Sequence, residues 1–224
     1  MQKLLMICGL LLAGSTQAAV VSVRTGVDNL GAVLAAGSID PNWTISTNGS
    51  DFSSARVAYP GSYPNYSSGQ ICCGMETISA DAAWITTPSV LPTSPTTGWG
   101  ISNMVYARTE FDLSDFDLSS VSLNGLWRVA DVATGIYLNG NLLAGTATYG
   151  YAFSSSLPFS VAAGSSFFVS GINRLELRGY SVNNVWDGFW VAADVKGDLA
   201  PVPVPGAFGL MLGGLLMLVK LKRT

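Results

Sequence analysis

The middle of the chain alternates between apolar and polar residues with a period of two. Val105, Ala107, Phe111 and Leu113 occupy every second position or nearly so, and polar or charged residues stand between them. Such alternation is typical of a strand that buries one face and exposes the other. Further strand-like runs, separated by turns that contain Gly or Asn, occur at residues 121–131, 136–138, 142–143, 167–169, 175–177 and 189–195.

Turn signals predict how these strands are connected. Asn139-Gly140-Asn141 separates two of them and predicts a tight hairpin, because Asn and Gly adopt positive φ at little cost. Residues 55–97 are rich in Pro, Ser, Tyr and Gly, which predicts long loops. No helical period is evident between the two ends of the chain. Short strands with frequent turns therefore predict an all-β, antiparallel β-sandwich.

The N-terminal residues follow a different pattern. Lys3 precedes an apolar run over residues 4–13, and small residues such as Thr16 and Ala18 follow it. A run of this length is too short to cross about 30 Å of hydrocarbon as a helix, and it is typical of a signal peptide. We therefore expect residues 1–18 to form a signal helix that signal peptidase removes after Ala18. The alternative, an N-terminal core helix, would have to continue through small and polar residues.

The C-terminal residues predict a membrane anchor. Asp198 is the last acidic residue, and residues 199–219 are then an uncharged stretch of 21 residues. Lys220, Lys222 and Arg223 close the chain as a basic tail. The stretch is long enough for one transmembrane helix, and basic residues stay on the cytoplasmic side, so the middle of the chain would face outward. A buried C-terminal core helix is the alternative.

Composition and charge support the same division of the chain. The sequence is 49% hydrophobic and 11% charged, and the apolar excess lies at the two ends. Residues 19–198 remain as one domain, large enough to bury a core. This region holds all 14 acidic residues but lacks four of the 11 basic ones, so its net charge is −7. An acidic domain without a basic stripe is not expected to bind nucleic acid.

The tail at residues 199–224 resembles the PEP-CTERM sorting signal, which combines a proline motif, a membrane helix and a basic end. Val202, Pro203, Val204 and Pro205 match the family's Val-Pro-Glu-Pro motif at three of four positions, with Val204 in place of Glu. The resemblance implies that a membrane protease, exosortase, cuts near this motif and passes the protein to the envelope or exopolysaccharide. Signal peptidase and an exosortase-like protease are thus the expected partners.

Motifs in the middle region resemble a galactose-binding-like jelly-roll domain of PEP-CTERM proteins. In chain order they are Asp40-Pro41-Asn42-Trp43, Trp84-Ile85 and residues 107–113, 127–131, 136–140 and 171–175. Together they span most of residues 38–196 in the expected order. The resemblance implies an antiparallel jelly-roll β-sandwich with weak glycan binding.

Catalytic chemistry is restricted by the absence of histidine from the sequence. Without it, Ser-His-Asp hydrolysis and His metal ligation are excluded. Catalysis would depend on paired carboxylates, as in glycoside hydrolases. Asp112, Asp115 and Asp117 form the densest acidic cluster, but solvated turn carboxylates are the ordinary interpretation. We therefore assign no catalytic residue and no metal site, and we expect a protein that is not an enzyme.

Asp131 follows an apolar strand and precedes the dipeptide Thr134-Gly135, which predicts a turn. One interpretation makes it a ligand of Ca²⁺ or an acceptor for a sugar hydroxyl near the loops of the sandwich; no cofactor other than Ca²⁺ is expected. The other interpretation makes it a residue that caps its own turn by accepting backbone N–H groups. The turn preference favours the second interpretation.

Cys72 and Cys73 are the only cysteines left once the signal is removed. An oxidising compartment favours a disulfide, and the only intrachain partner of each is its neighbour. Such a bridge closes a strained ring and stiffens a loop. Reduced thiols and intermolecular disulfides remain as alternatives.

The tryptophans divide into two groups by their surroundings. Trp43, Trp84 and Trp127 stand among strand-like apolar residues and are expected in the core. Trp99 and Trp186 stand in loop contexts and are candidates for a platform on which a sugar ring stacks. The alternative is that these two cover the edge of the core.

These observations favour an exported bacterial protein of the cell surface or of the exopolysaccharide or biofilm matrix, which binds glycan and catalyses no reaction. A purely structural envelope protein without a small ligand is the alternative. A carboxylate-based carbohydrate-active enzyme is the least favoured class.

Overall fold

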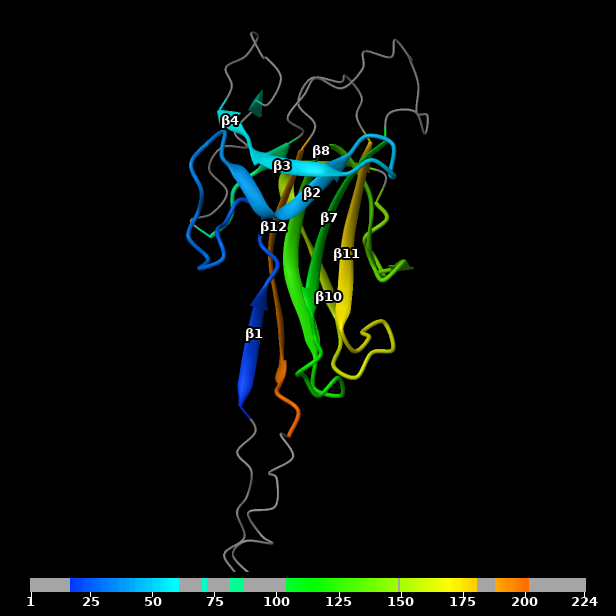
Figure 1. Ribbon diagram of the computed structural model, residues 1–224. Coiled ribbons are helices and arrows are strands. Elements are labelled where there is room, and N and C mark those ends of the chain that lie inside the picture. Colours follow the sequence, from blue (N-terminus) through cyan, green and yellow to red (C-terminus); the bar gives the residue numbers. More distant parts are fainter. Residues whose placement is uncertain are drawn as a thin grey trace, which may run out of the picture. The chain divides into compact units, whose positions relative to one another are not determined.

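Figure 1 shows the computed structural model of the protein, in which residues 17–60, 70–71, 81–86, 104–148, 150–180 and 188–201 are described. Residues Gln17–Leu199 form one compact unit. Every regular element in the described ranges is a β-strand, which confirms the all-β prediction. In these ranges there is no helix with the length and apolar character needed to cross a membrane.

The described residues contain twelve strands: β1 (Ala18–Ser22), β2 (Ile39–Ser46), β3 (Ser53–Val57), β4 (Tyr59–Pro60), β5 (Gln70–Ile71), β6 (Ile85–Thr86), β7 (Met104–Asp112), β8 (Ser122–Leu138), β9 (Asn141–Leu142), β10 (Gly150–Val161), β11 (Ile172–Tyr180) and β12 (Gly188–Asp198). Ten of them form one antiparallel sheet in the order β1-β12-β6-β3-β2-β7-β11-β8-β10, with β9 paired to β8. A further pairing joins β12 to β8, so the sheet curls on itself and encloses a core. β4 and β5 form a separate parallel pair.

Strand β8 belongs to both parts of the curled sheet. Its first half pairs with β12 and its second half with β11, and β10 lies along the opposite edge. The prediction of two separate strands, at residues 121–131 and 136–138, is therefore wrong. Val132 and Ala133 are consecutive and both fully buried. The strand is covered on both faces there, so the alternation that would have marked it as a strand disappears.

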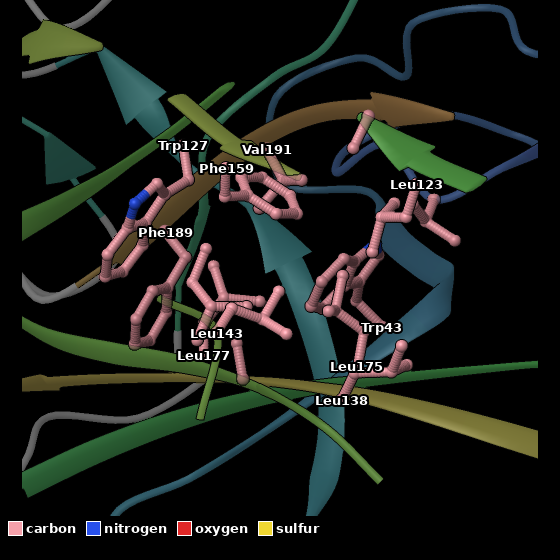
Figure 2. Close-up of a cluster of buried hydrophobic side chains, with 14 of the residues drawn as sticks. Trp43, Leu123, Trp127, Leu138, Leu143, Phe159, Leu175, Leu177, Phe189 and Val191 are labelled. Carbon is pink, nitrogen blue, oxygen red and sulfur yellow. The ribbon is translucent and has the colours of Figure 1, made fainter. Parts of the chain in front are cut away.

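The core lies inside the curl and consists of aromatic and aliphatic side chains (Figure 2). Trp43 and Trp127 lie in this cluster, at most 1% exposed, together with Phe189. Trp84 is also buried, so the prediction that these three tryptophans are buried in the domain is confirmed. Burial of one large apolar side chain contributes roughly 2 kcal/mol, which makes this cluster a main source of stability.

Asp40 fastens the start of β2 to the segment that precedes it. This buried carboxylate accepts backbone N–H bonds from Gly26 at 2.6 Å, Asn42 at 2.8 Å and Trp43 at 3.1 Å. The indole N–H of Trp43 donates to the Arg24 carbonyl at 3.0 Å. The motif at residues 40–43 therefore has a structural role that joins two distant backbone segments.

Two asparagines fasten the loop that precedes β11. Asn173 is fully buried; its side chain accepts the Val169 N–H at 2.9 Å and donates to the carbonyls of Val169 and Gly171. Asn139 donates to the side chain of Asn173 at 2.8 Å from the predicted hairpin, where its φ is 51°. The strand expected at residues 167–169 is wrong, because these residues form part of this fastened loop.

The two ends of the compact unit lie side by side. β1 pairs with the last residues of β12, which places Ala18 opposite Asp198. The Leu199 N–H also donates to the Gln17 carbonyl at 2.9 Å. The chain therefore enters and leaves the unit at the same end of β12, where β1 and the end of β12 run together in Figure 1.

Candidate functional site

A cluster of charged and aromatic side chains covers the outer surface of β7, β11 and the second half of β8. Every second residue of β7 and β11 points to the core, as buried Ala107 and Leu177 do. The residues between them face outward, and the sheet register brings them together. We call this surface the polar face; it consists of Phe52, Tyr106, Arg108, Glu110, Tyr137, Arg174, Glu176 and Arg178.

Glu176 is the centre of the polar face. Its carboxylate accepts a hydrogen bond from Nη2 of Arg108 at 2.8 Å and another from Nε of Arg178 at 2.8 Å. Only 12% of the Glu176 side chain is exposed, so its charge is largely removed from water and depends on both arginines. Charge-assisted bonds of this geometry are stronger than neutral ones, so they hold the three side chains in fixed positions.

Aromatic rings also contact the same two arginines. The guanidinium carbon of Arg108 lies 3.7 Å from the ring centre of Phe52, and that of Arg178 lies 3.8 Å from the ring centre of Tyr137. Both distances suit a cation–π contact. Each guanidinium is therefore fixed twice, by an ion pair with Glu176 and by a stacked ring.

Two glycines allow two tyrosine rings of the polar face, Tyr137 and Tyr106, to lie close to the backbone. A β-carbon at Gly135 would come within 2.8 Å of Leu142 and 3.3 Å of the Tyr137 ring. A β-carbon at Gly49, which has a φ of 76°, would come within 3.1 Å of the Tyr106 ring. Any larger residue at either position would displace a ring of the polar face or its neighbour.

The turn between β2 and β3 borders the polar face and is held by several side-chain hydrogen bonds. The side-chain oxygen of Asn48 accepts hydrogen bonds from Ser46, Ser50 and Asp51 at 2.8 to 2.9 Å. The Nδ2 of Asn48 donates to the Asp51 carboxylate at 2.6 Å. This turn carries Phe52 to its place over Arg108, so one flank of the polar face is held in shape before any ligand arrives.

The polar face combines hydrogen-bond donors, acceptors and aromatic rings. It presents guanidinium donors beside carboxylate acceptors, and the third pair, Arg174 with Glu110 at 2.9 Å, is about half exposed. The buried Nε of Arg108 has no hydrogen-bond partner among the described residues. Paired donors and acceptors next to flat rings suit a ligand that carries both hydroxyl groups and apolar C–H surfaces.

Sequence analysis did not identify this surface. The signal was present in part, because Arg and Glu alternate with apolar residues along residues 105–113 and 172–180. However, this alternation is also typical of an ordinary solvent-facing strand. Arg108 and Glu176 are 68 residues apart, and only the register of β7 against β11 shows that they touch.

Asp131 lies in β8, and the strand continues through Thr134 and Gly135. The prediction that a strand ends at Asp131 before a turn is therefore wrong. β8 is buried on both faces at Val132 and Ala133, so the sequence lacks the alternation that would show that the strand continues past Asp131. The position of the Asp131 side chain is not described, so its role as a Ca²⁺ or sugar ligand stays a prediction.

The other residues singled out from the sequence lie outside the described ranges: Cys72, Cys73, Trp99, Trp186, Val202, Pro203, Val204, Pro205, Lys220, Lys222 and Arg223. The described residues that flank positions 87–103 and 181–187 are paired with one another. Thr86 and Gly188 are paired at one border of these segments, and Met104 and Tyr180 at the other. The roles proposed for Trp99 and Trp186 stay predictions.

Two of the three carboxylates in the acidic cluster at residues 112–117 cap turns. Asp112 accepts hydrogen bonds from the N–H and hydroxyl of Ser114, and Asp117 accepts those of Ser119. Mainly through the hydroxyl bonds, these contacts hold the pKa of each carboxyl below its usual value. Both carboxyl groups therefore favour the ionised form, which accepts hydrogen bonds well at a turn. A general acid must carry a proton, so neither group is suited to that role at neutral pH.

The described residues contain no group of three or more His, Cys, Asp or Glu side chains that could hold a metal ion. A scan against protein-family models found no match, and a search of curated proteins found none either. Within the described ranges, the polar face is the surface on which we build a functional proposal.

Proposed function

We propose that this protein is exported from a bacterial cytoplasm to the cell surface or the exopolysaccharide matrix, where its β-domain binds polysaccharide and catalyses no reaction. In this proposal residues 1–18 are a signal peptide, residues 19–198 a galactose-binding-like jelly-roll domain, and residues 199–224 a PEP-CTERM-like sorting tail with a transmembrane helix. Signal peptidase and an exosortase-like protease process the two ends.

The positions of the domain's ends support the export part of the proposal. Ala19, where the mature chain would begin, is paired with Gly197 near the end of β12, so the chain enters and leaves the unit at adjacent points. Both flanking sequences have the composition of membrane-directed segments. A domain whose two ends lie together can have both segments enter one membrane without stretching across the fold.

The polar face is the observation that carries the binding part of the proposal. It combines fixed arginines, a shared carboxylate and stacked rings on one surface of a rigid sheet. Rigid side chains lose little conformational entropy when a ligand binds, which favours recognition of weakly binding repeated units.

One observation favours the second candidate, a purely structural envelope protein. Each ion pair of the polar face is complete without a ligand, and such networks also stabilise sheets that bind nothing. A carboxylate-based carbohydrate-active enzyme finds less support, because Asp112 and Asp117 are occupied as turn caps.

Intact-mass measurement of protein isolated from the cell envelope tests the export and sorting proposal. The proposal predicts a mature chain that begins at Ala19 and lacks the residues beyond about Pro205. A chain that begins at Ala19 but still ends at Thr224 would indicate an uncut membrane anchor. A full-length chain in the cytoplasm would overturn the proposal.

A further inference from the structure

We infer that the polar face binds a neutral, hydroxyl-rich polysaccharide rather than a charged polymer. This inference rests on the proposed function, whose glycan-binding role it makes specific. It concerns a surface on the strands, and it does not involve the segments that carry Trp99 and Trp186.

The charge of the surface points to a neutral ligand. The polar face contains three arginines and two glutamates, and its ion pairs join every one of them to an opposite charge. The domain around it carries a net charge of −7. Three arginines and two glutamates leave the face itself a net charge of +1 (3 − 2), with each arginine already paired, so a polyanion would find no cluster of unpaired cations there and would be repelled by the rest of the domain, whereas a neutral polymer is affected by neither charge.

The hydrogen-bonding groups of the surface match neighbouring sugar hydroxyls. A hydroxyl both donates and accepts, and a guanidinium offers five N–H donors in a fixed plane. The side chains of Arg108 and Arg178 are 22% and 35% exposed, and those of Arg174 and Glu110 are about half exposed, so part of each group is open to a ligand. Adjacent hydroxyls can therefore find a donor on Arg108 or Arg178 and an acceptor on Glu110 or Glu176 without the ion pairs having to break.

The aromatic groups supply the complementary apolar contact. Tyr137 is half-buried, and the Leu142 side chain, which is 44% exposed, lies beside it over Gly135. Sugar C–H faces bind well to such flat apolar surfaces because both partners lose water. β11 lies between β7 and β8, and Glu176 is paired with both Arg108 and Tyr137, so the backbones of Arg108, which Phe52 covers, and of Tyr137 are about 10 Å apart across the strands. That span exceeds one hexose ring and favours a polymer over a monosaccharide.

Affinity electrophoresis of the processed protein through gels that contain one polysaccharide each tests the inference. The neutral set is dextran, galactomannan and xyloglucan, and the acidic set is alginate and polygalacturonate, in a sugar-free non-ionic detergent. We expect retardation by at least one neutral polymer, unchanged when the salt concentration rises to about 0.5 M, where exposed charges are screened within a few ångströms.

Substitutions locate the binding surface. Tyr137→Ala and Arg178→Ala should weaken retardation about tenfold, and Tyr137→Phe should retain it, because the ring rather than the hydroxyl makes the contact. Leu30→Ala is the matched control, since it removes an apolar side chain that is 93% exposed and absent from the polar face. Circular dichroism of every variant checks that the β-structure is preserved, and Arg178→Ala still tests the surface if Tyr137→Ala does not fold.

Three results would overturn the inference: no retardation by any neutral polymer, retardation only by acidic polymers that salt abolishes, or equal retardation of wild type, Tyr137→Ala and Arg178→Ala. A protein that reaches the envelope but shows one of these results would refute the ligand and leave the export proposal standing. A protein that binds a neutral polymer but stays in the cytoplasm would refute the export proposal alone.

Discussion

Replacement of Asp40 tests the structural role of the motif at residues 40–43. Asp40→Asn keeps an oxygen for the N–H groups of Asn42 and Trp43, but it turns an NH₂ group toward the N–H of Gly26, which now loses its acceptor. Gly26 cannot move away easily, because a β-carbon there would already lie 2.5 Å from the β-carbon of Ala83. One buried donor without a partner costs about 1–3 kcal/mol.

Asp40→Ala removes all three bonds and should cost more. Two of the three donors, Gly26 and Trp43, are in buried bonds, so the expected loss is about 3–5 kcal/mol. The lower part of this range is favoured, because the buried carboxylate itself carries a desolvation penalty that the substitution removes.

Equilibrium urea unfolding followed by tryptophan fluorescence measures both changes. With an m-value of about 2 kcal/mol/M, Asp40→Asn should lower the midpoint by about 1 M and Asp40→Ala by about 2 M, with m unchanged. Leu30→Ala, at an exposed position, should leave the midpoint within about 0.3 M. Equal midpoints for wild type and Asp40→Asn would refute the reasoning, because the Gly26 contact would then contribute nothing.

Three further predictions concern pH, the loop before β11 and the cysteines. Burial, partly offset by backbone hydrogen bonds, raises the pKa of Asp40 above 3.8, so the folded state binds this proton more tightly than the unfolded state. The stability of wild type relative to Asp40→Asn should therefore fall as pH rises from about 3.8 through the raised pKa, and it should stay level above that pKa. Urea midpoints that move the opposite way would contradict this. Asn173→Ala removes a fully buried amide and should destabilise the fold by about 2 kcal/mol in the same urea assay, a change of under about 0.5 kcal/mol being the contrary result. Cys72 and Cys73 should form a disulfide in exported protein, so peptide mapping without reductant should yield a fragment lighter by two hydrogen atoms, whereas alkylation of both native thiols would exclude it.

The sequence allowed prediction of the parts of the fold where one face is buried and the other is wet. β7 shows clean alternation because Val105, Ala107 and Phe111 enter the core while Arg108 and Glu110 face outward. The hairpin after β8 was predictable for a local reason, since Asn139 and Gly140 adopt positive φ.

Elements covered on both faces, or held by distant contacts, were not predictable. β8 shows no alternation where Val132 and Ala133 are both buried, and the loop at residues 167–169 resembles a strand because Phe168 is buried. Its loop conformation depends on hydrogen bonds between Val169 and the side chain of Asn173, which no local pattern reveals.

The candidate site was hidden for a related reason. Its residues come from β7, β8, β11 and the turn before β3. The register between the strands brings them side by side, although they are far apart in the sequence. In the sequence, Arg108 and Glu176 are ordinary charges on ordinary strands. Their shared ion pair, and the rings stacked on Arg108 and Arg178, become visible only when the strands are aligned.

The partition of wild type and Tyr137→Ala between the polysaccharide matrix and the growth medium of the native bacterium is the most direct test of the account. Both proteins should be exported and should lack residues 1–18, because Tyr137 lies far in sequence from either end of the chain. The account predicts that wild type stays with the matrix, that Tyr137→Ala is released into the medium, and that Tyr137→Phe and Leu30→Ala behave like wild type. Full-length wild type in the cytoplasm, or equal matrix retention of wild type and Tyr137→Ala, would contradict it.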